Sequence, residues 1–250
     1  MPMEVLRGIA EALGLPLSAS QVHQFEEYYR HLIAANRRVS LTSVTDYEEV
    51  QTRHFGESLA VGVALYRARV LRTGESSAVV DLGAGAGFPG LPLKIAHPSL
   101  RLTLLEATAK KASFLNQLVA QLELPDVVVI SERAETVAHD PAHRQRYDLV
   151  LARAVAPLAV LLELALPFLR VGGHLATPKG SRAPKEIAEA GPALEICGGR
   201  ILSAQPLPSP PPSLRSGQAL PLTLVLVEKV GPTPAAYPRR PGIPARRPLR

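Results

Sequence analysis

Residues 79–90 form the part of the chain with the clearest capacity for chemistry. They read Val-Val-Asp-Leu-Gly-Ala-Gly-Ala-Gly-Phe-Pro-Gly, an apolar run that meets an acid and then glycines at alternate positions. A buried strand ending at Asp81 would pass into a loop at Gly83, Gly85 and Gly87 with no side chains in the way. A ribose and a charged tail could then lie directly against the backbone. A carboxylate before such glycines is typical of an S-adenosylmethionine site, which predicts a methyltransferase.

The same segment also matches G-x-G-x-x-G over residues 85–90, a pattern that binds dinucleotides. In that pattern no acid lies between the strand and the glycine turn, and the following helix holds a pyrophosphate through free N–H groups. Asp81 departs from the first feature, and Pro89 removes one of those N–H groups. S-adenosylmethionine is therefore favoured. A dinucleotide-dependent oxidoreductase and a glycine turn without a ligand remain as alternatives.

Two further strand ends carry polar residues that suit the same nucleoside. Glu106 ends the second predicted strand, where an acid can accept both ribose hydroxyls, and its neighbours Ala107 and Thr108 share that exit. An N-cap of the following helix is the alternative role for Glu106. After the third strand, the N–H groups of Ala134 and Glu135 could contact an adenine ring while a carboxylate accepts from its amino group. All five residues are predicted cofactor contacts.

The fourth and fifth predicted strands lead to cations. Arg153 follows residues 147–152, where many amino-methylating enzymes carry Asp/Asn-Pro-Pro-Tyr, and that motif is missing here. The single cysteine, Cys197, follows a predicted helix, so thiolate attack on a pyrimidine is not expected. Guanine N7 has an exposed lone pair and no proton to lose, so its methylation depends on positioning. Arg153 could hold a carboxylate or an RNA phosphate, and Lys179 a phosphate or the guanine; a surface arginine and a turn lysine are the alternatives.

The predicted elements bring these residues to one edge of a sheet. From Ala78 onward strands alternate with helices, which predicts a parallel sheet with helices on both faces. The expected strands are residues 78–82, 101–106, 126–130, 147–152 and 172–177, then an antiparallel hairpin of 200–206 and 220–229. The expected helices between them are residues 90–96, 108–122, 157–169 and 182–190.

The first quarter of the chain shows helical periodicity and no strand-like alternation. Hydroxyls near Ser18 and the carboxylate of Asp46 are N-cap candidates. The expected helices are residues 3–14, 20–36, 46–54 and 57–69. We therefore predict a helical cap over residues 1–72, a cofactor-binding domain over 73–230 and a C-terminal arm over 231–250.

Composition limits the setting in which the protein works. A chain of 250 residues with one cysteine suits a single α/β domain with additions in a reducing compartment. No apolar run is long enough for a membrane span, and no signal peptide is evident; we expect a cytoplasmic monomer. The net charge is +6, and the arm holds five arginines without an acid.

The arm has two interpretations. Its like charges attract phosphate by counterion release, and its prolines favour an extended chain. Nucleic-acid contact is favoured over a disordered, solubilising tail. The predicted RNA-binding residues of the arm are Arg239, Arg240, Arg246 and Arg247.

The chain resembles the RsmG (GidB) family of bacterial 16S ribosomal RNA guanine-N7 methyltransferases from about residue 20 to 230. The first two matching segments belong to no general S-adenosylmethionine fold, so the resemblance is specific to a family. The matching segments are residues 36–45, 53–58, 81–90, 110–115, 133–135, 153–154 and 179–180.

The resemblance implies a fold, a cofactor and a substrate. The fold would be a Rossmann-like, mostly parallel seven-stranded sheet that binds S-adenosylmethionine, with no metal. The substrate would be one guanine of 16S ribosomal RNA or of the small ribosomal subunit; a protein or small-molecule substrate is the alternative. Arg153 and Lys179 would be important for activity. Cofactor contacts would be Gly83, Phe88, Ala134, Glu135 and Arg153, and the substrate side would hold Asn36, Arg53 and His54.

Overall fold

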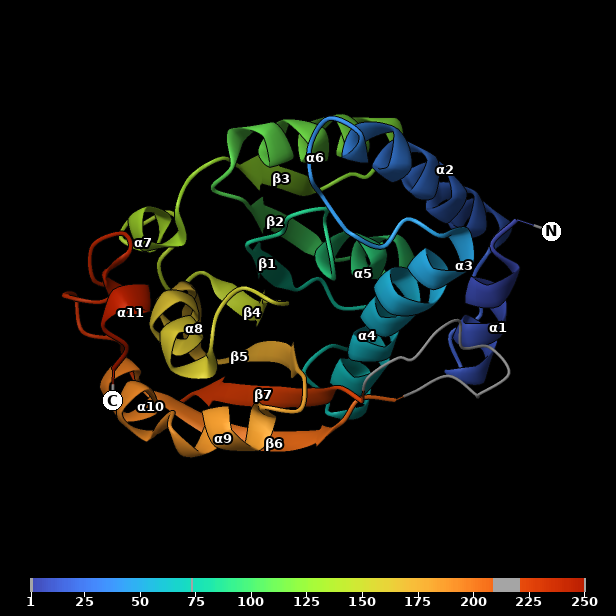
Figure 1. Cartoon of the computed structure of the whole chain (residues 1–250). Helices are drawn as coiled ribbons and strands as arrows, with labels where there is room; N and C mark the ends of the chain where they lie inside the picture. Colours follow the sequence, from blue (N-terminus) through green and yellow to red (C-terminus); the bar gives the residue numbers. More distant parts are fainter. Residues whose placement is uncertain (1, 73, 209–220, 250) are drawn as a thin grey trace.

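A computed structural model describes the whole chain except residues 1, 73, 209–220 and 250, and its centre is a seven-stranded sheet (Figure 1). The strand order is β3-β2-β1-β4-β5-β7-β6. Neighbouring strands are parallel from β3 to β5, whereas β7 is antiparallel to both β5 and β6. The strands are β1 (Ala78–Leu82), β2 (Arg101–Leu105), β3 (Val127–Ile130), β4 (Tyr147–Leu151), β5 (Leu169–Lys179), β6 (Gly199–Pro206) and β7 (Thr223–Lys229).

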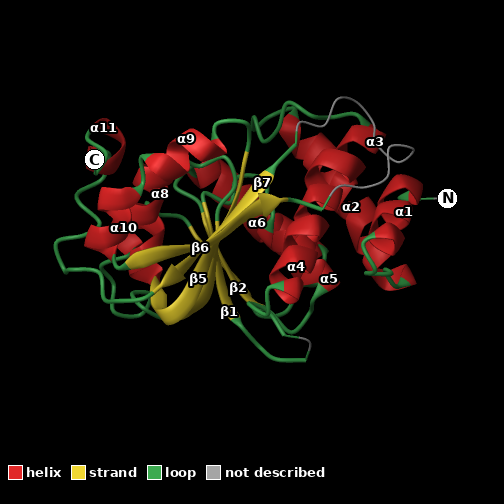
Figure 2. Cartoon of the chain, turned by 90° about the horizontal axis from the view of Figure 1, so that it is seen from below, coloured by secondary structure: helices red, strands yellow, loops and turns green. Residues whose placement is uncertain are grey.

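Helices cover both faces of the sheet, which Figure 2 shows nearly edge-on. One layer holds the helices that precede β3 in the chain, and the other holds those that follow it. The first layer comprises α1 (Glu4–Ala12), α2 (Ala19–Asn36), α3 (Tyr47–Val50), the π-helix η1 (Gln51–Gly56), α4 (Glu57–Arg67), α5 (Gly90–Ala96) and α6 (Ala109–Gln121). The second comprises α7 (Ala134–Val137), α8 (Leu158–Ala165), the 3-10 helix η2 (Leu166–Phe168), α9 (Ala183–Ala188), α10 (Gly191–Cys197) and α11 (Ile243–Arg246).

Two hydrophobic cores fill the spaces between the sheet and the helix layers. Successive strand side chains point to opposite faces, so Val79 joins the core under α2, α4 and α5 while Val80 joins the core under α8 and α10. Strands buried on both faces must be apolar at nearly every position. A polar residue in such a strand, such as Asp81, therefore needs a separate explanation.

The N-terminal helices are joined to the sheet layer by specific polar contacts. Ser18 and Gln21 form a capping box at the start of α2. The same Gln21 side chain donates to the Ile95 carbonyl at 2.8 Å, which ties α2 to α5. Asp46 caps α3 by accepting from two backbone N–H groups of the first turn. Both predicted caps are confirmed, and α2 begins at Ala19, next to its predicted start at residue 20.

The structure confirms the predicted fold class and the C-terminal hairpin, and corrects four local predictions. The fifth strand is longer than predicted, from Leu169 to Lys179, and it shortens the helix before it. The helix predicted over 182–190 is two helices, so Cys197 ends α10 instead of following a helix. The helix predicted over 46–54 is α-helical only from Tyr47 to Val50, and Gln51–Gly56 form the π-helix η1. The arm is not extended throughout, because α11 forms there.

Within the described ranges, no helix is both long and apolar enough to cross a membrane.

Candidate active site

The glycine loop after β1 has the open backbone that its sequence predicts. Gly83, Gly85 and Gly87 all have positive φ, at 65°, 59° and 101°, a conformation that is strained for residues with a Cβ atom. At Gly87 an added Cβ would also meet the Tyr28 hydroxyl at 2.5 Å. Glycine is thus required there by packing as well as by conformation.

Asp81 is fully buried beneath this loop, and only one of its carboxylate oxygens has a partner. Its Oδ2 accepts from the Gly90 N–H at 2.8 Å, whereas Oδ1 has no hydrogen-bond partner. Burial raises the pKa of this carboxyl to about 7, although the Gly90 N–H and the Arg153 guanidinium act in the opposite direction. A buried, unpaired oxygen is unfavourable for folding, which points to a ligand.

Glu106 joins the ends of β1 and β2. Its Oε2 accepts from the Gly85 N–H at 2.9 Å, and its Oε1 accepts from the Thr108 N–H at 2.7 Å. Thr108 is the N-cap residue of α6 but makes no side-chain cap. Glu106 therefore orders the glycine loop while its carboxylate keeps lone pairs free. Ala107 and Thr108 are exposed beside it.

These groups fit S-adenosylmethionine. A carboxylate with an unpaired oxygen suits a cationic amine, a second carboxylate at the adjacent strand end suits ribose hydroxyls, and glycines allow close approach. Asp81, Glu106 and the loop between Gly83 and Gly87 would hold the group. Among the described residues, no three His, Cys, Asp or Glu side chains are grouped as metal ligands.

The third predicted cofactor position lies at the start of α7 and touches the C-terminal arm. The Glu135 carboxylate is nearly buried and accepts from the Gly242 N–H at 2.9 Å. Ala134 is half-buried at the first position of the helix. The Glu135 carboxylate is thus engaged by the arm, while the backbone of α7 remains the part that an adenine could contact.

Arg153 connects the end of β4 to the N-terminal helices. Its guanidinium donates to the Arg53 carbonyl at 3.0 Å and to the Glu57 carboxylate at 3.3 Å. It also lies 5.4 Å from the centroid of the Phe88 ring, within reach of a cation–π interaction. Phe88 is buried and stacks on Tyr28 with 5.4 Å between centroids. Arg153 therefore joins the glycine loop to π-helix η1.

His54 completes this connection. Its Nδ1 lies 2.7 Å from Arg153 Nη2, and its Nε2 lies 2.8 Å from Thr42 Oγ1. Because a guanidinium can only donate, Nδ1 must accept, and the proton of the neutral ring lies on Nε2. Burial and the neighbouring Arg153 lower the pKa of His54 to about 3. The ring is thus neutral at physiological pH.

Of the two other predicted substrate-side residues, Asn36 binds a nearby loop and Arg53 is partly exposed. The Asn36 side chain accepts from the N–H groups of Leu41 and Thr42 and donates to the Thr42 carbonyl. It therefore orders the loop that presents Thr42 to His54. The Arg53 side chain is partly exposed and pairs with Glu49 at 2.6 Å.

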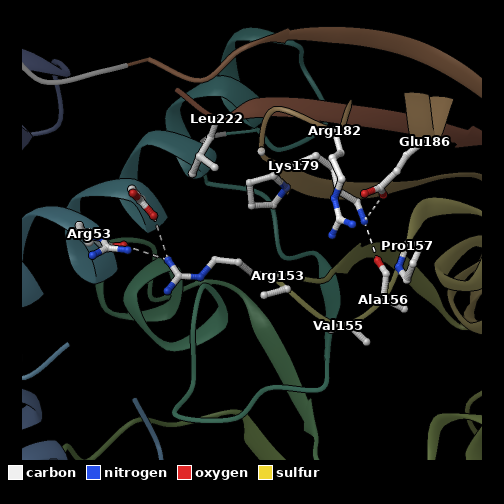
Figure 3. Close-up of a pocket in the computed structure, with 13 residues that line it drawn as sticks. Arg53, Arg153, Val155, Ala156, Pro157, Lys179, Arg182, Glu186 and Leu222 are labelled. Atoms are coloured by element: carbon white, nitrogen blue, oxygen red, sulfur yellow. Dashed lines mark hydrogen bonds and ion pairs between the residues drawn. The ribbon is translucent and has the colours of Figure 1, made fainter. Parts of the chain in front are cut away.

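A cavity of about 550 Å³ opens between Arg153 and Lys179 (Figure 3). Lys179 comes from the end of β5 and donates to the Ala156 carbonyl at 2.6 Å while pairing with Glu186 at 3.0 Å. Figure 3 shows Arg53 and Arg153 on one side of the cavity and Lys179 and Arg182 on the other. The strand ends thus bring the two predicted catalytic residues to one concave, cationic site.

The arm docks on the face of the sheet that α7 and α8 cover (Figure 1). The Arg239 guanidinium makes two hydrogen bonds, at 2.9 and 2.6 Å, to the carboxylate of Glu163, whose side chain is fully buried in α8. Its backbone N–H donates to the same carboxylate. Arg239, predicted as an RNA contact, is therefore an anchor of the arm. Arg240, Arg246 and Arg247 are exposed.

Four residues that hold the site and the arm in place were not predicted from the sequence. Glu57 pairs with Arg153, Thr42 binds His54, and Glu163 anchors Arg239. Val155 approaches Gly83 so closely that an added Cβ would lie 3.0 Å from its methyl group. Glu163 carried a signal of its own, as an acid within the apolar run of α8, and Thr42 and Glu57 lie within the matching segments 36–45 and 53–58.

Comparison with known proteins shows one family over most of the chain. The family model described as rRNA small subunit methyltransferase G matches residues 21–209. A relative of that name from Roseiflexus castenholzii is 48% identical over 99% of this chain and 100% of its own length. One from Dehalococcoides mccartyi is 44% identical over 98% and 99%.

Solved structures show the fold. A putative RNA methyltransferase from Pyrococcus horikoshii aligns with a TM-score of 0.51 at 14% identity, over 81% of this chain and 99% of its own. Geranyl diphosphate methyltransferase in complex with SAM gives a TM-score of 0.51 at 16% identity, over 69% and 85%.

Proposed function

The chain belongs to the rRNA small subunit methyltransferase G family, whose fold is that of S-adenosylmethionine-dependent methyltransferases, and from that premise we propose that it methylates N7 of one guanine in small-subunit ribosomal RNA. One structural observation supports this proposal independently of the family. The cationic cavity at the ends of β4 and β5 lies beside the glycine loop, and Arg153 belongs to the cavity and contacts Phe88 of that loop. A nucleotide in the cavity would be adjacent to the cofactor.

Methyl transfer to N7 requires little from the protein besides positioning of the purine. S-adenosylmethionine supplies a methyl group on a positively charged sulfur. The chain's own residues must hold the purine so that the N7 lone pair lies in line with that group, which can supply on the order of 7–11 kcal/mol of the barrier reduction. Lys179 and Arg182, whose side chains face the cavity, are suited to hold the nucleotide's phosphate.

The side chains that line the cavity support an acceptor with no proton to lose. Both acids there are ion-paired, Glu57 with Arg153 and Glu186 with Lys179. The neutral His54 ring beside them accepts from Arg153. These acceptors are therefore occupied by cations, and none is free to act as a general base.

The position of the cysteine supports the same choice of acceptor. Cys197 is fully buried in α10, and burial raises the pKa of its thiol to about 11. A thiolate there is unfavourable and cannot reach the cavity, so methylation through covalent attack on a pyrimidine is not supported.

The arm's exposed arginines suit a second contact with RNA. Arg240, Arg246 and Arg247 make no side-chain hydrogen bond or ion pair within the described residues, and Arg239 holds the segment that presents them. They would add affinity through phosphate and make it sensitive to salt. The cytoplasmic location and the monomeric state of the protein stay predictions.

Tritiated S-adenosylmethionine tests the reaction directly. The purified protein would be incubated with small-subunit rRNA from cells that lack the gene, and the RNA would be digested to nucleosides. We expect the label in 7-methylguanosine, at one position. Label in another nucleoside would refute the N7 assignment, and label in protein or in a small molecule would support the alternative substrate class.

A further inference from the structure

A second concave surface lies between α2 and α6, outside the catalytic cavity. The two helices run antiparallel along one side of the molecule (Figure 1). Near one end the Gln24 side chain donates to the Leu122 carbonyl at 2.9 Å. Near the other end a groove of about 620 Å³ opens between the end of α2 and the first turns of α6. Its volume is in the range that holds a ligand of nucleotide size.

The groove is cationic at its rim and apolar inside. Arg38 and Lys110 are exposed at the rim, and no acid is present among the lining residues. Within the described part of the chain, neither side chain makes a hydrogen bond or an ion pair. Arg37 and Lys111 add two more cations at the same end. The apolar lining residues are Ala34, Ala35, Val39, Ala109, Phe114 and Leu118.

Helix stability does not account for these lysines. Lys110 and Lys111 lie in the first turn of α6, which contains no acid. Cations there oppose the helix dipole, so they weaken the helix instead of supporting it. A solvated helix face would also be expected to mix acids with bases, and this groove does not.

Both walls of the groove are continuous in sequence with segments of the active site. Ala109 and Lys110 follow directly after Glu106 and Thr108, the residues that join the glycine loop to α6. At the other wall, Val39 leads into the loop that Asn36 orders and that presents Thr42 to His54. Both walls of the groove therefore continue directly into segments that position the glycine loop and His54.

We infer that this groove binds a segment of the RNA substrate beside the target nucleotide, with phosphates on Arg38 and Lys110. The inference rests on the proposed function and adds a surface to it. Charge complementarity selects the occupant, because a rim of unpaired cations without acids suits a phosphate backbone. The apolar floor suits ribose and base faces that a single-stranded segment leaves exposed.

Neutralising the rim tests the inference. The double variant Arg38→Gln and Lys110→Gln would be compared with a control, Arg72→Gln and Arg101→Gln, which removes two exposed cations near the amino ends of β1 and β2. Binding of protein-free small-subunit rRNA would be measured from 50 to 200 mM salt. We expect the slope of log affinity against log salt to fall in magnitude by about 1.5 in the groove variant and to stay unchanged in the control.

A second variant leaves the cations in place. Ser113→Glu puts an acid on the exposed groove wall, and we expect it to weaken RNA binding while the dissociation constant for S-adenosylmethionine stays at the wild-type value. If the groove and control variants share one salt slope while the wild type methylates RNA, the groove is refuted and the proposed function stands. If the wild type neither binds nor methylates RNA, both are refuted.

Discussion

Replacing Asp81 with asparagine should separate the stability of this fold from its function. Asp81 is fully buried, and its Oδ1 has no partner in the protein. Asparagine has the same shape and can still accept from the Gly90 N–H. It removes the charge, however, which we propose is required to hold the amine of S-adenosylmethionine.

The magnitude follows from the pKa of the carboxyl. Burial raises the pKa of Asp81 from an ordinary 3.8 to about 7. The folded protein therefore retains a proton that the unfolded chain loses, and stability falls as pH rises from about 4 to about 7. Each pKa unit corresponds to about 1.4 kcal/mol. Above that pH range, ionisation of Asp81 therefore lowers the free energy of unfolding by up to about 4 kcal/mol. The variant avoids this cost.

Urea unfolding at pH 8 and at pH 5, together with titration calorimetry, tests the reasoning. We expect Asp81→Asn to be more stable than the wild type at pH 8, by up to about 4 kcal/mol. The gain should be less than half as large at pH 5, where the folded carboxyl keeps its proton and only the unfolded chain has lost it. Binding of S-adenosylmethionine should be lost. A variant less stable than the wild type at pH 8, or equally shifted at both pH values, would refute the burial argument. Normal cofactor binding would refute the ligand role.

Three other substitutions probe the remaining contacts. Glu163→Ala removes the carboxylate that accepts from the partly exposed Arg239 guanidinium, so urea unfolding should show a loss of about 1.5–3 kcal/mol; a loss under about 1 kcal/mol would contradict the anchoring role. Gly83→Val adds a side chain at a φ of 65° against Val155, and calorimetry should show weaker S-adenosylmethionine binding with circular dichroism unchanged. Arg153→Lys cannot reproduce the hydrogen bonds of the guanidinium, so we expect kcat for RNA methylation to fall at least tenfold; wild-type kcat would show that Arg153 is dispensable.

The fold could be predicted because its signals are local. Each parallel strand is a short apolar run, and each helix between strands has its own periodicity. The predictions that failed concern places where distant contacts decide. Leu169–Lys179 is a long strand because it pairs with β4 on one side and β7 on the other. The arm folds because Glu163 and Glu135, far away in the sequence, accept its hydrogen bonds.

Residue type and spacing along the chain were enough to predict the glycine loop, the acid that precedes it and the order of the strand ends. Which charged side chains lack a partner, by contrast, depends on how the chain packs. Arg239 is paired with the buried carboxylate of Glu163, and Arg153 donates to Glu57 and His54. Arg38 and Lys110 have no such partner within the described part of the chain. A side chain's partner is fixed by packing between segments that are distant in the sequence, and no local pattern records it.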